Sequence, residues 1–354
     1  MSTTGDLAHR PGRDRHLDAT VLICTFDRAD LLSATLESLA RTVAPDLRWD
    51  VLVVDNNSSD DTRAVVERCA ARYPVALRYV FEPNPGKSFA LNTGIAATTA
   101  DIIAFTDDDV RVSPEWLTRL VAGLERHRCE YVGGRVTPLW QCEPPRWLPR
   151  VNGQLWGVIA LVDYGPHPIE FVRRVPLGVN MAVRREAFQR TGGFNTSIGR
   201  KAGTLLGQEQ REWCVRATAA GLVGYYLPDA VIEHVIPADR LTKRYFRRWF
   251  YWRGIARAIL YAQSGLDMER PGDSRVNVRD VPHMAGVPRY LYRTALRVAW
   301  YALLAKLRNR PVESFERELW LWMFAGIVRQ RWTDRRTSPG VEAAVAQPAR
   351  YSNR

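Results

Sequence analysis

Cysteine is scarce in this chain of 354 residues, and its five copies are scattered. They are Cys24, Cys69, Cys129, Cys142 and Cys214. Their number is odd, and no two of them have the C-x-x-C spacing that is typical of zinc sites and redox motifs. The pattern favours reduced thiols in a cytosolic protein over a disulfide framework or a zinc site.

Long apolar runs are also lacking. The opening stretch, MSTTGDLAHRPGRDRHLDA, has no apolar core of the kind that a secretory signal needs. The longest apolar run near the C-terminus, Leu319 to Val328, has about half of the roughly 20 residues that a bilayer span requires. We therefore expect no secretory signal, no transmembrane helix and a cytoplasmic location.

The chain does have an excess of positive charge and enough apolar residues for a core. Its 50 Lys and Arg residues outnumber its 38 Asp and Glu residues, which gives a formal net charge of +12. Hydrophobic residues make up 46% of the chain, which suffices for one domain with an appendage. The positive charge favours an anionic partner, either nucleic acid, an anionic membrane surface or a phosphorylated ligand.

Short apolar runs alternate with helical patterns after residue 18. Strands are expected at 20–26, 49–57, 76–82 and 101–109, and helices at 29–41, 60–73 and 87–97. This alternation predicts an α/β fold with a mostly parallel sheet covered by helices on both faces. In such sheets, ligands bind at the carboxyl ends of the strands.

The character of the sequence changes after Pro237, where basic and aromatic residues become interleaved. We found no internal repeat. The predicted organisation has four parts: a disordered segment at 1–18, an α/β domain at 19–237, a basic and aromatic helical extension at 238–332 and a disordered tail at 333–354.

Three adjacent carboxylates end the fourth expected strand, within FTDDDVR at residues 105–111. Asp107, Asp108 and Asp109 repel one another unless a positive charge lies among them. One interpretation is a solvated turn, because Asp is common in turns and caps. The other is a divalent metal site, because hard cations take oxygen ligands and remove the repulsion.

Polar residues follow two other strands as well. Thr25 and Asp27 come after the first strand, and Asp55 comes after the second. All of these strand ends would meet at one rim of a parallel sheet. This convergence favours a ligand site over an isolated polar turn.

Six segments resemble, in the same order, those of inverting glycosyltransferases of family 2, which have the GT-A fold. They are VLICTFDR (21–28), VLVVDNNSSDDT (51–62), NPGKSFALNTGI (84–95), FTDDDV (105–110), LGVNMAVRREAFQRTGGFN (177–195) and GQEQREWCVR (207–216). The resemblance covers about residues 19 to 236. It implies a metal-dependent transferase that moves a sugar from a nucleotide-diphosphate donor, expected to be a UDP-sugar. The implied acceptor is a hydroxyl of a carbohydrate, a lipid-linked or another molecule, in the synthesis of polysaccharide, glycolipid or other cell-surface glycan.

The resemblance gives roles to the first polar clusters. Thr25, Asp27 and Asp55 would hold the base and ribose of the nucleotide, and Lys87 would touch the nucleotide or its phosphates. For Asp55 the alternative is a turn-forming residue, and for Lys87 it is a surface lysine. NPGKS is not a phosphate-binding Walker motif, because Phe81 stands where that motif has its first glycine.

The resemblance also implies a metal site for Mn²⁺ or Mg²⁺. Asp107 and Asp109 would bind the cation, Asp107 also lying near the ribose, and His234 would add a ligand or touch the diphosphate. Asp108 would contact the donor sugar or only support the turn. Asn180 would read sugar hydroxyls through its amide. The alternative for His234 is a purely structural role, and the alternative for Asn180 is an ordinary amide at a strand end.

An inverting displacement needs a general base for the acceptor hydroxyl. The family usually has an acidic pair after a glycine, and this chain has Gln210 where the Asp would stand. Because glutamine cannot take a proton, Glu209 is the expected base and Glu212 the second candidate. Arg216 lies four residues beyond Glu212 and would make it structural by pairing with it.

The segment from Leu241 to Arg257 interleaves arginines with aromatic residues. It fits nucleic acid, an anionic membrane or amphipathic helices packed on the first domain. Because enzymes of the family often act on lipid-linked acceptors, we expect peripheral membrane contact, at the inner face of the plasma membrane, and no nucleic-acid partner. The rival hypothesis is a non-catalytic or divergent GT-A protein that binds membrane or nucleic acid through this basic tail. A nucleotidyltransferase would need a glycine-rich, basic first loop, which CTFDRAD does not supply.

Overall fold

The computed structural model describes residues 16–149, 155–172, 174–265 and 278–337. The chain forms two compact units, and each is described by itself. The first comprises Met1–Leu139, Ala160–Thr196 and Gln210–Val235, and the second comprises Trp140–Ile159, Ser197–Glu209 and Ile236–Arg354. Two segments from within the predicted α/β domain at 19–237 thus group with the C-terminal helices.

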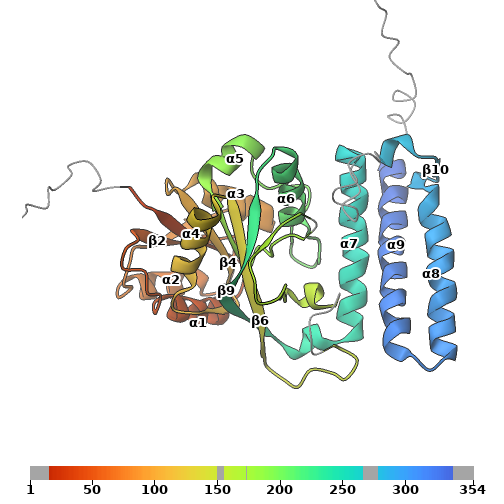
Figure 1. Ribbon diagram of the computed structural model, residues 1–354, viewed down its shortest axis with the longest axis horizontal. Helices are drawn as coiled ribbons and strands as arrows, with labels where there is room; N and C mark the ends of the chain where they lie inside the picture. Colours follow the sequence, from red (N-terminus) through yellow and green to blue (C-terminus); the bar gives the residue numbers. More distant parts are fainter. Residues whose placement is uncertain (1–15, 150–154, 173, 266–277, 338–354) are drawn as a thin grey trace, which may run out of the picture. The chain divides into compact units, whose positions relative to one another are not determined.

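The first unit is built on a sheet of nine strands among the described residues, in the order β3-β2-β1-β4-β8-β6-β9-β5, with β7 beside β9 (Figure 1). Its first four strands are parallel: β1 (Ala19–Thr25), β2 (Trp49–Asp55), β3 (Leu77–Phe81) and β4 (Ile102–Asp107). The strands β1, β2 and β4 are almost wholly buried, which explains their unbroken apolar runs.

Helices connect these parallel strands. They are α1 (Ala29–Leu39), α2 (Thr62–Ala70) and α3 (Lys87–Ala96), and α4 (Trp116–His127) follows the acidic triplet. Each connecting helix returns the chain to the edge of the sheet where the parallel strands begin. The carboxyl ends of these strands therefore all lie at the opposite edge and form one rim. The predicted α/β sheet with flanking helices is confirmed.

The second half of the sheet runs antiparallel. Its strands are β5 (Val110–Val112), β6 (Tyr131–Trp140), β7 (Ile169–Glu170), β8 (Asn180–Arg184) and β9 (Gly224–Ile236), with α5 (Arg185–Thr191) and α6 (Glu209–Ala219) between β8 and β9. β8 pairs with β4, so that Asn180 lies opposite Thr106. β5 pairs with β9, so that His234 lies opposite Val110, directly after the acids. The sequence patterns predicted neither β5 nor β7, which are too short to show a period.

The second unit contains three long helices, α7 (Lys243–Ser264), α8 (Arg289–Leu307) and α9 (Pro311–Thr337). α9 packs against both α7 and α8 (Figure 1). A short hairpin of β10 (His283–Met284) and β11 (Val287–Pro288) precedes α8. α9 continues to Thr337, past residue 333 where the tail was predicted to begin, and the rest of that tail lies outside the described residues, as do residues 1–15. No helix in the described part of the chain combines the length and apolar character needed to cross a bilayer.

Two glycines bring the backbones of α7 and α9 into direct contact. A Cβ added at Gly254 would lie 1.9 Å from the carbonyl oxygen of Met323, and one at Gly326 would lie 2.0 Å from that of Tyr251. Neither distance leaves room for a methyl group, because these neighbours are backbone atoms, which cannot rotate away as a side chain could. The glycines therefore set how closely these two helices approach.

We expect Gly254→Ala to destabilise the second unit by about 1–3 kcal/mol, because α7 and α9 must move apart to admit the methyl group. Denaturant unfolding followed by far-UV circular dichroism measures this loss. Gly157→Ala, in the same unit, is the matched control, since nothing lies within 4 Å of a Cβ at that position. Equal stability of the two variants would contradict the close helix contact.

Candidate active site at the strand ends

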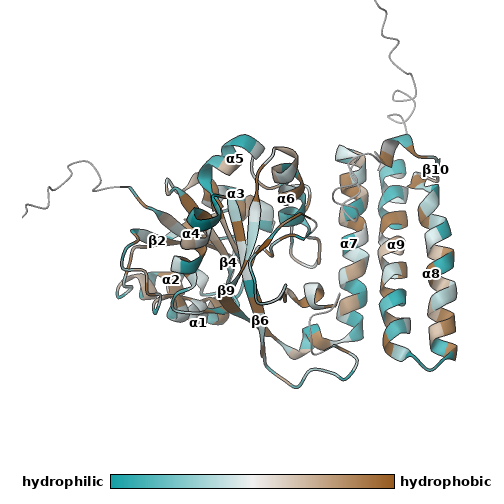
Figure 2. Cartoon of the chain, viewed as in Figure 1, coloured by the Kyte–Doolittle hydropathy of each residue, from teal (hydrophilic) through white to brown (hydrophobic). Residues whose placement is uncertain are grey.

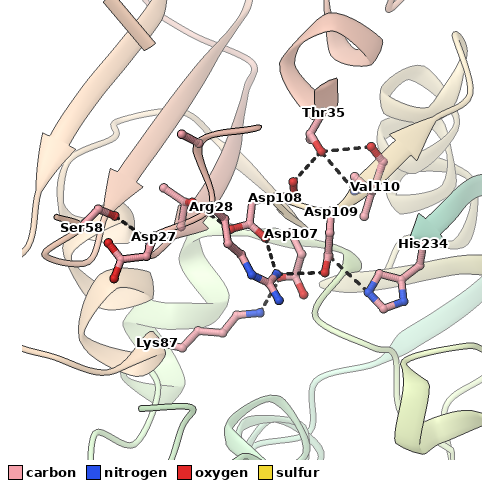
Figure 3. A network of polar contacts seen from close by, with 12 residues as sticks. Asp27, Arg28, Thr35, Ser58, Lys87, Asp107, Asp108, Asp109, Val110 and His234 are labelled. Atoms are coloured by element: carbon pink, nitrogen blue, oxygen red, sulfur yellow. Dashed lines mark hydrogen bonds and ion pairs between the residues drawn. The ribbon is translucent and has the colours of Figure 1, made fainter. Parts of the chain in front are cut away.

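The acidic triplet lies where β4 ends, at the carboxyl edge of the parallel strands (Figure 3). Asp108 and Asp109 are buried, whereas Asp107 is half-buried. The Thr25 hydroxyl, at the end of β1, donates a hydrogen bond of 2.8 Å to Oδ2 of Asp108. The structure thus joins two strand ends that the sequence analysis assigned to one rim.

A guanidinium lies between two of these acids. Nη1 of Arg28 is 2.9 Å from Oδ1 of Asp108 and 3.0 Å from Oδ2 of Asp109 (Figure 3). Burial disfavours the charge, but Asp108 and Asp109 raise the pKa of Arg28 above its ordinary value. Arg28 is not among the site residues predicted from the sequence, although it follows Asp27 directly on the loop after β1. In this structure a side chain of the protein itself offsets the repulsion between the acids.

Asp108 is held from several sides. Burial raises the pKa of its carboxyl group to about 6, the negative charge of Asp109 adds to the effect, and Arg28 opposes it. The hydroxyl of Thr35, on α1, donates to the backbone carbonyl of Asp108 at 2.8 Å. With Thr25 and Arg28 on its carboxylate, Asp108 is tied into the protein, which favours its role as a support for the turn.

The pairing of β5 with β9 brings His234 to the acids. Nε2 of His234 lies 3.2 Å from Oδ1 of Asp109, and both side chains are buried. Asp107 is engaged elsewhere, because Nζ of Lys87 lies 2.5 Å from its Oδ1. Within the described ranges, no three His, Cys, Asp or Glu side chains are grouped so as to hold a metal ion. Asp109, with Asp107 on the same loop, nevertheless supplies carboxylate oxygens of the kind that suit Mn²⁺ or Mg²⁺, and His234 adds an imidazole nitrogen beside Asp109.

Asn56 fixes the loop that presents Lys87. Its Oδ1 accepts a hydrogen bond of 2.7 Å from the N–H of Gly86, and its Nδ2 donates to the carbonyl of Asn84 at 2.7 Å. Gly86 has a φ of 140°, a conformation that other residues rarely adopt. Lys87 then begins α3 and reaches Asp107. The loop therefore places a positive charge at the rim without forming a Walker motif.

The predicted nucleotide residues Asp27 and Asp55 differ in their surroundings. Asp27 is exposed, and its Oδ1 accepts from the N–H of Ser59 at 2.6 Å. Asp55 is buried, and its two oxygens accept from the N–H of Ser58 at 2.9 Å and the hydroxyl of Tyr79 at 2.7 Å. Burial and this bond raise the pKa of Tyr79 to about 12. Asp55 thus has the geometry of the turn-forming alternative, while Asp27 is the more accessible carboxylate.

Asn180, at the start of β8, forms its hydrogen bonds in the protein interior. Its side chain is fully buried, and its Oδ1 accepts from the indole N–H of Trp116 at 2.8 Å. Its Nδ2 donates to the carbonyls of Arg135 and Ala230, each at 2.9 Å. Because both amide hydrogens are used within the protein, this geometry favours an interior role for Asn180 over the predicted reading of sugar hydroxyls. Asn180 instead joins β6, β9 and α4.

The candidate bases lie on α6, which begins at the buried Glu209. Glu212 forms a two-pronged ion pair with Arg216, with distances of 2.7 Å from Nε to Oε1 and 2.8 Å from Nη2 to Oε2. Gln210 lies against Gly178, where an added Cβ would be 2.3 Å from the amide nitrogen of the glutamine. The pairing of Glu212 with Arg216 matches the structural alternative for Glu212.

Comparisons with known proteins place the chain in a family. The family model described as glycosyl transferase family 2 matches residues 20–192. The chain is 30% identical over 244 residues to the succinoglycan biosynthesis protein ExoM of Rhizobium meliloti (strain 1021), covering 67% of this chain and 74% of ExoM. It is 28% identical over 259 residues to the glucosyl-dolichyl phosphate glucuronosyltransferase of Haloferax volcanii, covering 71% of this chain and 80% of that protein. The chain belongs to glycosyl transferase family 2 and is an enzyme of the glycosyltransferase class.

Solved structures agree on the fold. The mannosyltransferase PcManGT from Pyrobaculum calidifontis, in complex with GDP-Man and Mn²⁺, matches with a TM-score of 0.52 and 20% identity over 94% of this chain and 79% of that one. GalNAc-T7 with UDP, GalNAc and Mn²⁺ matches with a TM-score of 0.51 and 12% identity over 75% of this chain and 55% of that one. These likenesses confirm the predicted GT-A fold.

Proposed function

We propose that this glycosyltransferase moves a sugar from a nucleotide-diphosphate donor, a UDP-sugar, to an acceptor hydroxyl with inversion and with the help of Mn²⁺ or Mg²⁺. The observation that carries the proposal is the rim where Arg28, Lys87, the acidic triplet and His234 converge. ExoM takes part in succinoglycan biosynthesis by its name, which supports the synthesis of a polysaccharide or another cell-surface glycan.

The metal would be held by Asp109 and His234, with Asp107 as the second carboxylate. When bound, such a cation offsets the negative charge that develops on the leaving nucleoside diphosphate. Two solved structures of the same fold contain Mn²⁺ together with GDP-Man or with UDP and GalNAc, which supports this assignment.

Other residues of the rim would bind the donor. Lys87 and Arg28 place two positive charges beside the acids, where an anionic diphosphate would lie. The exposed carboxylate of Asp27 is suited to accept a hydrogen bond from the base or the ribose. Thr25 would hold the carboxylate of Asp108 in place, and Asp55 would hold the loop after β2.

Glu209 is our proposed general base, and Glu212 serves as its matched control on the same helix. We expect Glu209→Gln to lower kcat by about 10²–10⁴-fold, because the amide cannot accept the proton of the acceptor hydroxyl. Glu212→Gln loses the ion pair with Arg216 and should keep kcat within about tenfold of the original. Steady-state kinetics and the thermal shift with UDP, which both variants should retain, check this. The opposite ranking of the two variants would move the base to Glu212.

A thermal-shift panel of nucleotide sugars, with and without Mn²⁺, tests the proposed donor class. A ligand present at about 100 times its Kd stabilises the folded protein by roughly 2.7 kcal/mol, so the true donor should stand out from the others. Absence of any shift with nucleoside diphosphates and their sugars in Mn²⁺ and in Mg²⁺ would refute the proposal.

A divergent GT-A enzyme, whose transfer reaction differs from the one proposed here, is the second candidate, and Gln210 is the observation that favours it. Slow metal-dependent hydrolysis of a nucleotide sugar, with water in place of the acceptor, separates the two. Hydrolysis that is lost in an Asp109 variant supports the enzyme with this rim as its active site. Nucleotide binding with no hydrolysis and no transfer to the hydroxyl acceptors tested supports the divergent enzyme.

A further inference from the structure

One face of α8 exposes a row of large apolar side chains. Leu296, Trp300, Leu303 and Leu307 are 74%, 59%, 48% and 74% exposed. Their spacing of four, three and four residues puts them on one side of the helix, in a stripe about 16 Å long. A single exposed leucine needs no explanation, but a contiguous apolar stripe of this kind marks an interaction surface. We call these four residues the α8 stripe.

The α8 stripe is not the face that packs within the second unit. The opposite side of α8 carries the buried Leu291 and Ala305. Leu291 belongs to a cluster with Ile327 of α9, against which Phe324 also packs. The helix is therefore already anchored through one face, and the stripe remains as a second apolar surface. Figure 2 shows hydrophobic residues beside hydrophilic ones along the helices of this unit.

The charged side chains of α8 itself all have one sign. α8, with the sequence RYLYRTALRVAWYALLAKL, contains no Asp or Glu. Arg293 and Arg297 are exposed, and at helical spacing they border the stripe on one side. Lys306 and Arg308 are exposed at its C-terminal end. The first acid that follows in the chain, Glu313, pairs with Arg310 and Arg317 rather than with α8.

Part of the basic and aromatic run from Leu241 to Arg257, which was expected to contact a membrane, packs within the second unit. Arg247 pairs with Glu318 of α9 at 2.7 Å, and Arg257 is only 5% exposed, with Tyr261 as a hydrogen-bond partner. Phe246 is fully buried and packs against Trp147. These contacts use much of the α7 run to hold the second unit together, whereas the α8 stripe remains exposed.

We propose that the α8 stripe docks on the surface of an anionic lipid bilayer, with α8 lying in the plane of the interface. Leucines and a tryptophan would enter the boundary between head groups and acyl chains, and the bordering arginines would meet lipid phosphates. A second copy of the chain fits less well, because two-fold pairing of this face would bring arginines against arginines. Nucleic acid fits less well because leucines occupy the centre of the face, where phosphates would lie.

The strength of membrane binding depends on the apolar stripe and on the basic residues beside it. A stripe of four side chains gives reversible attachment, since even a single acyl chain binds membranes only marginally. Each Lys or Arg near an anionic surface contributes about fivefold to the binding constant. The attachment should therefore weaken as salt is added, because the Debye length falls to about 8 Å at physiological ionic strength.

Co-sedimentation of the full chain with vesicles tests the proposal. We expect binding to vesicles that mix phosphatidylcholine with phosphatidylglycerol and little binding to phosphatidylcholine alone. Leu296→Glu combined with Leu303→Glu should weaken binding at least tenfold, and Arg293→Glu combined with Arg297→Glu should do so as well. Val43→Glu, at a 55% exposed apolar residue of the first unit, and Arg244→Glu, at an exposed arginine of α7, are matched controls that should bind normally.

Circular dichroism confirms that each variant is folded, and the thermal shift with UDP should be the same in all of them. This readout keeps the proposal separate from the proposed function, since vesicle binding needs no donor. Unchanged vesicle binding by both α8 double variants would overturn the proposal, as would equal binding to neutral vesicles. Absence of vesicle binding would also overturn the proposal. In that case, loss of a dimer by the stripe variants in size-exclusion chromatography would identify a second copy of the chain as the partner, and loss of DNA binding by the arginine variants would identify nucleic acid.

Discussion

Asp109→Asn should lower the rate of sugar transfer by about 10²–10³-fold and leave the fold intact. Asp109 faces His234 on one side and Arg28 on the other, and it is the acid that we assign to the metal. The amide keeps the shape of the side chain but removes the negative charge that would hold a cation. The loss should therefore appear in kcat and in the response to Mn²⁺, while far-UV circular dichroism stays unchanged.

The experiment compares donor turnover by the original chain and by Asp109→Asn over a range of Mn²⁺ concentrations. Asp229→Asn is the matched control, because Asp229 also belongs to the first unit but its side chain is 72% exposed. We expect this control to keep full activity. Full activity of Asp109→Asn in a folded protein would refute the metal assignment and leave the acids a structural role only.

Asn180→Leu should destabilise the first unit by about 3–5 kcal/mol, because it leaves three buried polar groups without their partner. These groups are the indole N–H of Trp116 and the carbonyls of Arg135 and Ala230. Leucine matches the size of asparagine but offers no donor or acceptor. Urea unfolding followed by tryptophan fluorescence measures the loss.

The exposed amide of Gln141 provides the control, and Gln141→Leu should change stability by less than about 0.5 kcal/mol. If Asn180 instead binds sugar hydroxyls, Asn180→Leu should have normal stability and a raised KM for the donor. The two readouts therefore decide between the interior role seen in the structure and the role that the family resemblance implied.

The sequence predicted the strands of the parallel half because their apolar runs are continuous and end in polar clusters. It could not show that β5 and β9 pair, since a three-residue strand has no period and register is a property of two segments far apart in the chain. For the same reason His234 could be proposed near the acids only through family resemblance. The two segments that join the C-terminal unit, 140–159 and 197–209, are likewise grouped by long-range packing.

Individual polar side chains were harder to predict than strands. An asparagine at a strand end fits both a sugar-binding site and an interior bond to carbonyls, and only the partners around Asn180 decide between them. Arg28 was missed because a lone arginine on a loop is most often a solvated charge. Its position between Asp108 and Asp109 depends on the pairing of β1 with β4 and on the packing of α1 against β5, which no local pattern records.

The guanidinium of Arg28 gives the rim the character of an ion-exchange site. A divalent cation that joined Asp109 would compete with a positive charge that is already present, so its affinity would be the difference between two attractions. The exchange would keep the acids neutralised, since Arg28 would retain Asp108 as a partner on leaving Asp109. The same arginine, once released from Asp109, would have donor groups that could turn toward an incoming anion.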